Sequence, residues 1–175
     1  MSNRDKKTRF KDIKQNYKQF DNILKIFLII GIIIISGFII YSLLTPKPGY
    51  ITYGLLNSNR KAENYPTNAT VGENITFYVS VGNFLNRDFS FRIEILKGNN
   101  NTKIGPFGSI NATSYLNSSV IFLSHGKNWI SNAYNISFSQ PGANQIVIAE
   151  LWESNIGLKD KFWEILTMRL NITSS

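Results

Sequence analysis

Two pairs of carboxylates are the residues of this sequence whose types and spacing could perform chemistry. Glu150 and Glu153 stand three residues apart, and Asp160 and Glu164 stand four apart. Two carboxylates beside a glycosidic bond can act as general acid and as nucleophile or base, so each pair could serve a carbohydrate-active enzyme. No substrate-binding motif accompanies them, and close pairs of acidic residues are frequent in proteins. We therefore expect a protein that is not an enzyme, in which basic neighbours balance these charges: Lys159, Lys161 and Arg169.

Other reactive residue types are scarce. The 175 residues include no cysteine and one histidine, His125, which stands in a glycine-containing turn. This composition excludes disulfides, thiolate metal sites, cysteine nucleophiles and multi-histidine metal centres. The chain has no glycine-rich phosphate loop, no nucleophile elbow and no aspartate-rich calcium loop. We expect His125 to be a solvated loop residue, and we expect no cofactor, no metal and no catalytic residue.

Seven asparagines carry the chain's clearest modification signal, the triplet Asn-x-Ser/Thr that accepts N-linked glycans. All seven follow residue 44, and none precedes it. Because Asn, Ser and Thr are abundant there, the placement of the triplets says more than their number. We predict glycan attachment at Asn68, Asn74, Asn100, Asn111, Asn117, Asn135 and Asn171.

The segment that precedes these acceptors, residues 26–44, carries no charge. A helix of this length extends about 28 Å, close to the thickness of a bilayer core. The segment is rich in isoleucine, which favours strands in water, but a lone segment in lipid must satisfy its backbone internally and only a helix does so. We predict a transmembrane helix. A removable signal peptide fits less well, since the preceding arm is long and residues 42–46 offer no small-x-small cleavage pattern.

Charge predicts the orientation of this helix. Residues 1–25 hold eight Lys and Arg residues against three Asp residues, which accounts for +5 of the total net charge of +8. Cationic flanks stay in the cytoplasm, so we expect the N-terminus inside and the C-terminal part outside. The basic excess is then a topology signal that favours anionic membrane lipid as a partner, and we expect no nucleic-acid partner. The predicted organisation is a cytoplasmic arm (1–25), a membrane span (26–44), a spacer (45–49) and an outer domain (50–175).

The arm has an apolar stripe at helical spacing, which leaves two interpretations open. It could be a helix that binds lipid or a neighbouring helix, or a partly ordered, solvated tail. The stripe consists of Phe10, Ile13, Tyr17, Phe20, Leu24 and Phe27.

The outer domain alternates apolar and polar residues with the period of a β-strand. Residues 74–81, 89–95, 134–138 and 166–172 alternate, while 50–56, 119–123 and 146–152 are shorter apolar runs. The phase places Asn74, Asn135 and Asn171 on the wet faces of their strands. Turn signals separate the runs, among them Lys97–Asn100 and His125–Asn128. Seven strands without an intervening helix predict an antiparallel, immunoglobulin-like β-sandwich.

Aromatic residues suggest a second kind of site. Tyr78 interrupts the polar face of its strand, so we single it out as a possible interaction residue. Tyr and Trp combine a large contact area with a polar group, and a cluster of them could bind carbohydrate or protein. For each residue alone, ordinary packing is the simpler explanation. The set is Tyr50, Tyr53, Tyr65, Tyr78, Tyr115, Tyr134, Trp129, Trp152 and Trp163.

A pattern of Gly, Pro and aromatic positions over most of residues 50–155 resembles the extracytoplasmic half of an archaeal membrane family known as domain of unknown function 1616. The resemblance implies a β-sandwich at an archaeal cell surface, and it implies no activity. Members usually have several transmembrane helices before this half, whereas this sequence predicts one. The matching segments are Tyr53-Gly54-Leu55, Asn64-Tyr65-Pro66-Thr67-Asn68, Val71-Gly72-Glu73-Asn74, Val79-Ser80-Val81-Gly82-Asn83, Gly126-Lys127-Asn128-Trp129 and Pro141-Gly142-Ala143-Asn144-Gln145.

These features together predict a membrane-anchored, glycosylated surface protein with a structural or an interaction role, towards either protein or glycan. One hypothesis is a component of a surface layer or of cell adhesion. The alternative is an accessory subunit of a larger membrane complex, to which small residues in the span lend some support because they let helices approach closely: Gly31, Ser36 and Gly37. A carbohydrate-active enzyme is the remote third.

Overall fold

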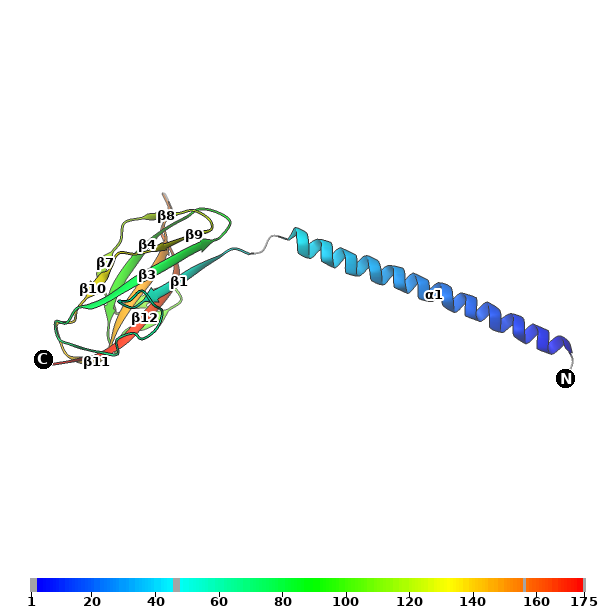
Figure 1. Ribbon diagram of the computed structural model, residues 1–175, viewed down its shortest axis with the longest axis horizontal. Coiled ribbons are helices and arrows are strands. Elements are labelled where there is room, and N and C mark those ends of the chain that lie inside the picture. Colours follow the sequence, from blue (N-terminus) through cyan, green and yellow to red (C-terminus); the bar gives the residue numbers. More distant parts are fainter. Residues whose placement is uncertain (1–2, 46–47, 156, 175) are drawn as a thin grey trace. The chain divides into compact units, whose positions relative to one another are not determined.

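The computed structural model describes residues 3–45, 48–155 and 157–174, and for residues 3–16 and 19 it describes the backbone alone. The chain divides into two compact units, Met1–Lys47 and Pro48–Ser175. The first is a helix and the second is a β-sandwich (Figure 1).

A single helix, α1 (Asn3–Leu44), includes both the predicted arm and the predicted span. Its stretch Phe20–Leu44 is apolar and long enough to cross a membrane, and none of it is buried within the protein. It therefore has the length and composition of a membrane anchor or of a signal sequence. Of the predicted arm stripe, Tyr17 and Phe20 are exposed, while the side chains of Phe10 and Ile13 lie outside the description.

The end of α1 follows from its last residues. Thr45 donates both its backbone N–H and its hydroxyl to the carbonyl of Tyr41, at 2.9 and 2.7 Å. Pro46 follows in the sequence, and proline has no N–H and disfavours helix in the residue before it. The helix therefore stops at Leu44.

The described part of the second unit contains twelve strands. All seven predicted strands are present, β8 and β10 shorter than predicted and several others longer. Five short strands (β2, β5, β6, β7 and β9) were not predicted. Two predicted turns are each half wrong, because Lys97 and Gly98 of the turn at 97–100 belong to β4 and Lys127 and Asn128 of the turn at 125–128 belong to β9. The strands are β1 (Tyr50–Leu56), β2 (Asn68–Thr70), β3 (Ile75–Phe84), β4 (Phe89–Gly98), β5 (Lys103–Gly105), β6 (Gly108–Ile110), β7 (Thr113–Asn117), β8 (Ile121–Leu123), β9 (Lys127–Ile130), β10 (Tyr134–Ile136), β11 (Gly142–Glu153) and β12 (Lys161–Thr173).

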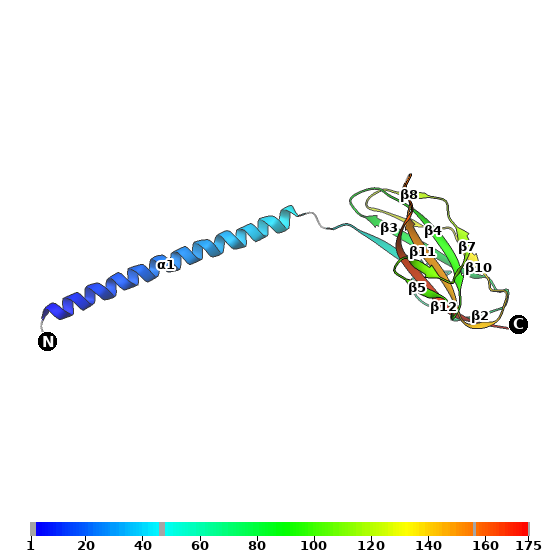
Figure 2. The same cartoon turned by 180° about the vertical axis from the view of Figure 1, so that it is seen from behind.

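Two sheets face each other. The first has the order β1-β3-β10, with β9 beside the other half of β3, and the second has the order β2-β12-β11-β4-β7, with β8 also on β4. Figure 1 shows the first sheet in front and Figure 2 the second. Between β1 and β2 the chain crosses from one sheet to the other, and β2 then runs parallel to the end of β12. The other strand pairs named here are antiparallel, so the predicted sandwich is confirmed, with one parallel pair at an edge.

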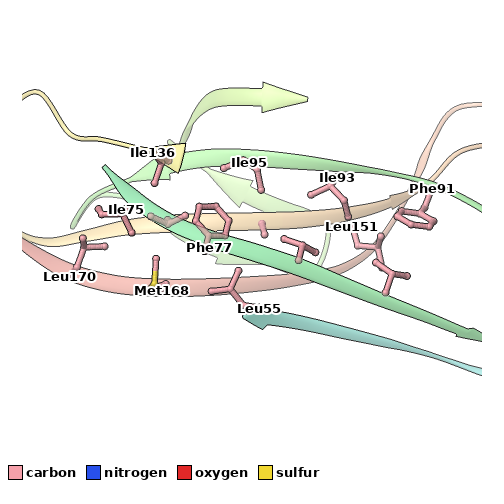
Figure 3. Close-up of a cluster of buried hydrophobic side chains, with 14 of the residues drawn as sticks. Leu55, Ile75, Phe77, Phe91, Ile93, Ile95, Ile136, Leu151, Met168 and Leu170 are labelled. Carbon is pink, nitrogen blue, oxygen red and sulfur yellow. The ribbon is translucent and has the colours of Figure 1, made fainter. Parts of the chain in front are cut away.

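The core lies between the sheets and is made by the alternating residues (Figure 3). Phe77, Phe91, Ile93, Ile136 and Leu151 are each no more than 1% exposed. Every member of this core belongs to the second unit. We therefore expect residues 48–175 to fold without the helix.

The outer face of the second sheet is also partly covered. Ile146 and Ile148 of β11 form a second apolar cluster with Leu96, against which Ala112 and Ile165 pack. Burial on both faces explains why β11 is a continuous apolar run in the sequence and does not alternate.

Candidate glycan acceptors and interaction sites

All seven predicted glycan acceptors have exposed side chains. In the three strand positions the phase is confirmed, because the residue after each asparagine is buried: Ile75 at 4%, Ile136 at 0% and Ile172 at 4% exposed. Exposure is what an attached glycan requires, and attachment itself stays a prediction.

Six of the seven acceptors gather at one end of the sandwich, where β3 begins and where β4 and β12 end. Asn74 directly precedes β3, and Asn135 lies opposite Thr76 in the β3–β10 pair. Asn68 and Asn171 are partners in the β2–β12 pair. Asn100 follows β4, and Asn111 donates its side-chain amide to the carbonyl of Asn101 at 3.4 Å. Asn117 is the exception, since it lies opposite Glu94 in the middle of β4.

Several acceptor side chains already have contacts. Asn135 accepts a hydrogen bond from the hydroxyl of Thr76 at 2.7 Å. Thr76 is the third residue of the Asn74 triplet, so two acceptor triplets are in contact here. Asn117 accepts one from the Arg92 guanidinium at 3.1 Å. In both bonds the acceptor is the side-chain oxygen of the asparagine. The side-chain nitrogen, to which a glycan attaches, takes part in neither bond.

The carboxylate pair Glu150 and Glu153 is held in structural contacts. Both side chains are buried, at 3% and 6% exposed. Glu150 accepts the backbone N–H of Ser109 at 2.6 Å and the indole N–H of Trp152 at 3.1 Å, and thereby ties the β5–β6 hairpin to β11. Glu153 pairs with Arg87 at 2.6 Å. Because residues three apart in a strand point to opposite faces, these two carboxylates do not converge on one substrate position.

The second pair is separated as well. Asp160 binds Arg92 at 2.6 Å, whereas Glu164 takes part in none of the ion pairs found among the described residues. The expectation that Lys159, Lys161 and Arg169 balance these acids is wrong. The cations that pair with the acids are Arg87 and Arg92, which strand pairing brings to β11 and to the turn that follows it.

His125 is exposed, as expected, and its Nδ1 accepts the backbone N–H of Asn86 at 3.1 Å. It thus links the turn after β3 to the turn after β8. Within the described part of the chain, no three His, Cys, Asp or Glu side chains come together as a metal site.

The aromatic residues are spread over the sandwich. Trp129 packs edge-on against Phe91 in the core, and Trp152 lies on the outer face of the second sheet beneath the Arg92 guanidinium, 5.2 Å from the ring centroid. Tyr78, the possible interaction residue, is half-buried, and the Arg60 guanidinium lies 4.9 Å from the centroid of its ring. One face of that ring is therefore occupied by the protein itself.

A cavity that the sequence analysis missed lies between β1 and β12. Its volume is about 310 Å³, and Ile51, Tyr53, Trp163, Glu164 and Leu166 line it. The Tyr53 hydroxyl is buried and has no hydrogen-bond partner among the described residues. Burial raises its pKa well above the usual value of 10.0, and the nearby Tyr134, Glu150 and Glu164 raise it further. The one signal of this cavity in the sequence was Tyr53 itself, which places a polar hydroxyl at a core-facing position between Ile51 and Leu55.

No protein-family model and no curated protein sequence matches the chain, so the family resemblance is not confirmed. Several solved structures are similar to it. A CARDB domain from Pyrococcus furiosus, in complex with di-metal ions, aligns over 74% of this chain and 93% of that chain, at 14% identity and a TM-score of 0.45. The C-terminal domain of Wzt aligns over 74% and 83%, at 11% identity and a TM-score of 0.45. A β-glucosidase from Listeria innocua aligns over 73% of this chain but 16% of that chain, at 7% identity and a TM-score of 0.44. At these values the similarities indicate nothing about what this chain binds or does.

Proposed function

We propose that this chain is a single-pass membrane protein whose N-terminus is cytoplasmic and whose glycosylated β-sandwich acts outside the cell as a non-catalytic structural or interaction module. The observation that carries the proposal is the unburied apolar helix. None of the apolar window of Phe20–Leu44 is buried. So large an apolar surface is stable in hydrocarbon and not in water.

Two independent features support the orientation. The basic excess lies before the helix, as it does in cytoplasmic flanks. All seven glycan acceptors lie after it and are exposed on the folded sandwich. Signal-sequence removal would leave the sandwich outside as well, but free of the membrane.

The distribution of acceptors favours a contact role for the rest of the sandwich surface. Six acceptors lie at the end opposite to the one where β1 begins, since Tyr50 pairs with Phe84 at the far end of β3. Glycans there would shield one end of the sandwich. The edges formed by β1 and by residues 161–170 of β12 carry none of the seven acceptors.

Glycan mapping tests the topology. Mass spectrometry of the protein from native membranes is expected to find glycans on sandwich asparagines. As a matched control, Asp5→Thr creates an Asn-Arg-Thr triplet at residues 3–5, and this site is expected to stay unmodified. A glycan on Asn3 in that variant would contradict the cytoplasmic arm, and unmodified asparagines throughout the sandwich would contradict the outer location.

A second candidate function, accessory subunit of a membrane complex, rests on α1 itself. At 1.5 Å per residue its 42 residues extend about 63 Å, twice a bilayer core, so the helix would also reach well beyond the membrane. A Cβ added at Gly31 or Gly37 would meet nothing within 4 Å, which leaves these positions open to a neighbouring helix. Purification in mild detergent distinguishes the two roles: a fixed set of co-purifying integral proteins that Gly31→Leu removes favours the subunit.

A further inference from the structure

We propose that the groove between β1 and β12 binds the ammonium group of a lysine side chain on a partner protein. This inference rests on the proposed function of an interaction module and specifies the chemistry of the partner. The groove is the cavity described above, which Tyr53, Trp163 and Glu164 help to line, and this cavity is the observation that carries the proposal.

The groove lies between β1, the edge strand of the first sheet, and the exposed edge of β12 in the second sheet. In the described sandwich β1 pairs with β3 and with no second strand, so its other edge is open. β2 pairs with residues 171–173 of β12, so the rest of that edge of β12 is open as well. An open edge can hydrogen-bond an extended segment of another protein through main-chain groups. In this binding mode a neighbouring pocket accepts one side chain of the added segment and gives specificity.

The lining of the cavity suits an aliphatic chain that ends in a cation. Ile51 and Leu166 supply aliphatic walls, and Tyr53 and Trp163 supply rings. The volume of about 310 Å³ lies at the lower end of ligand-pocket sizes, enough for one long side chain. Glu164 is the single charged residue in the lining, so complementarity requires a positive ligand.

The cavity has two polar groups, the Glu164 carboxylate, which only accepts hydrogen bonds, and the Tyr53 hydroxyl, which both donates and accepts them. The Glu164 carboxylate is in contact with the N–H of its own neighbour Ile165, at 3.2 Å, and with no cation in the described sandwich. The Tyr53 hydroxyl is buried and unpartnered. An ammonium group carries three N–H donors and no acceptor, so it matches the Glu164 carboxylate.

The protein already places one ammonium group beside this site. The Nζ of Lys161 lies 5.2 Å from the centroid of the Trp163 ring, within the range of a cation–π contact. The Trp163 ring thus attracts a cation at the edge of the cavity. Lys161 should compete with an incoming lysine, so removing its charge should strengthen binding.

The test uses the isolated sandwich, residues 48–175, which contains its whole core. The probe is N-acetyl-lysine methylamide, followed by amide NMR spectra, with N-acetyl-norleucine methylamide as the uncharged comparison. The lysine probe is expected to shift the signals of Tyr53 and Trp163 saturably. Glu164→Gln should weaken its binding about threefold, the scale of an exposed ion pair, and Lys161→Met should strengthen it. Asp88→Asn, which removes an exposed carboxylate elsewhere, should leave it unchanged.

Three outcomes would overturn the inference: no shifts with the lysine probe, equal shifts with norleucine, or shifts with methyl glucoside in place of lysine. A parallel experiment separates this failure from failure of the proposed function. If full-length Glu164→Gln in native membranes keeps every co-purifying protein, the interaction role stands and the lysine groove is wrong. Loss of one partner from this variant, and not from Asp88→Asn, supports the groove.

Discussion

The side-chain nitrogen of Asn171 lies 3.4 Å from the side-chain oxygen of Asn68. The two residues are partners in the parallel β2–β12 pair, and each begins a glycan-acceptor triplet. Neighbouring strands lie about 4.8 Å apart, which is narrower than a pyranose ring with its hydroxyl groups. Two glycans attached side by side would therefore collide at their first sugars.

We predict that the folded protein carries a glycan on Asn68 or on Asn171, but seldom on both. Asn68→Gln should raise the occupancy of Asn171, because it removes the competing sugar. Intact-protein and glycopeptide mass spectrometry measures both values, and the occupancy of Asn100, which is not paired with Asn68 or Asn171, serves as the internal control. Full occupancy of both sites in the native protein would contradict this prediction, because it would show that the two glycans fit side by side.

Asn135 and Ile136 test the strand phase. Asn135→Gln keeps an exposed polar side chain and loses at most the bond from Thr76, so we expect a loss of about 1 kcal/mol or less. Ile136 is fully buried, and Ile136→Asp should cost several kcal/mol because it buries an unpaired charge. Ile136→Val, the control for packing, should cost about 1 kcal/mol. Thermal and chemical denaturation of the sandwich measure all three, and a stable Ile136→Asp variant would refute the assigned phase.

Glu150 should be important for stability, as a buried acceptor. Glu150→Ala leaves the N–H groups of Ser109 and Trp152 without their acceptor, at a cost of about 2–4 kcal/mol. Glu150→Gln retains one acceptor oxygen and should cost less. Hydrogen exchange at the Ser109 amide should accelerate in Glu150→Ala as the β5–β6 hairpin detaches. Unchanged exchange there would show that the carboxylate does not hold the hairpin.

Acid should destabilise the turn before β3 through Glu73. The backbone N–H and the hydroxyl of Thr70 donate to its carboxylate at 2.7 and 3.0 Å, and these bonds lower its pKa from the usual 4.5. A lowered pKa in the folded state contributes stability above pH 4.5, and this contribution is lost as the pH falls through the folded value. Stability should therefore depend less on pH in the acid range for Glu73→Gln. Glu63→Gln, at an exposed carboxylate 3.7 Å from Lys61, is the matched control.

The strands that alternation predicted are those whose own residues carry the burial pattern. In β3, β4 and the second half of β12, alternate side chains enter the core, so period two is visible without knowledge of the partner strand. β7 is exposed along its whole length, and β2 has three residues, one of them buried. Such short edge strands are defined by the neighbour to which they bond, and their sequences carry little periodicity.

The candidate sites follow the same rule. Strand phase predicted the exposure of Asn74, Asn135 and Asn171, whereas Asn68 and Asn117 lie in β2 and β7, which were not predicted. The cavity could not be predicted, because Tyr53 and Trp163 are more than a hundred residues apart in the chain and meet only through the pairing of β1 with β3 and β12 with β11. The ion pairs of Arg87 and Arg92 with β11 and its following turn depend on the same long-range register.

Alkali should unfold the sandwich partly through Tyr53. Burial raises the folded pKa of this hydroxyl well above 10.0, so its contribution to stability is complete below pH 10 and is lost as the pH rises towards the folded value. The free energy of unfolding should therefore fall as the pH rises above 10. Tyr134, whose pKa burial also raises, adds a second contribution.

Tyr53→Phe should remove the first of these contributions and leave stability at neutral pH unchanged or higher, because the hydroxyl that it deletes is buried and unpartnered. Tyr65→Phe is the matched control. Its hydroxyl donates to the carbonyl of Leu55 at 2.6 Å, so its loss should cost about 1 kcal/mol at neutral pH. Denaturant unfolding at neutral and alkaline pH, with tyrosinate absorbance recorded in parallel, measures both effects. If Tyr53→Phe destabilises the sandwich as much as Tyr65→Phe does, the Tyr53 hydroxyl has a partner within the protein, and the groove between β1 and β12 is less open to a donor than its geometry indicates.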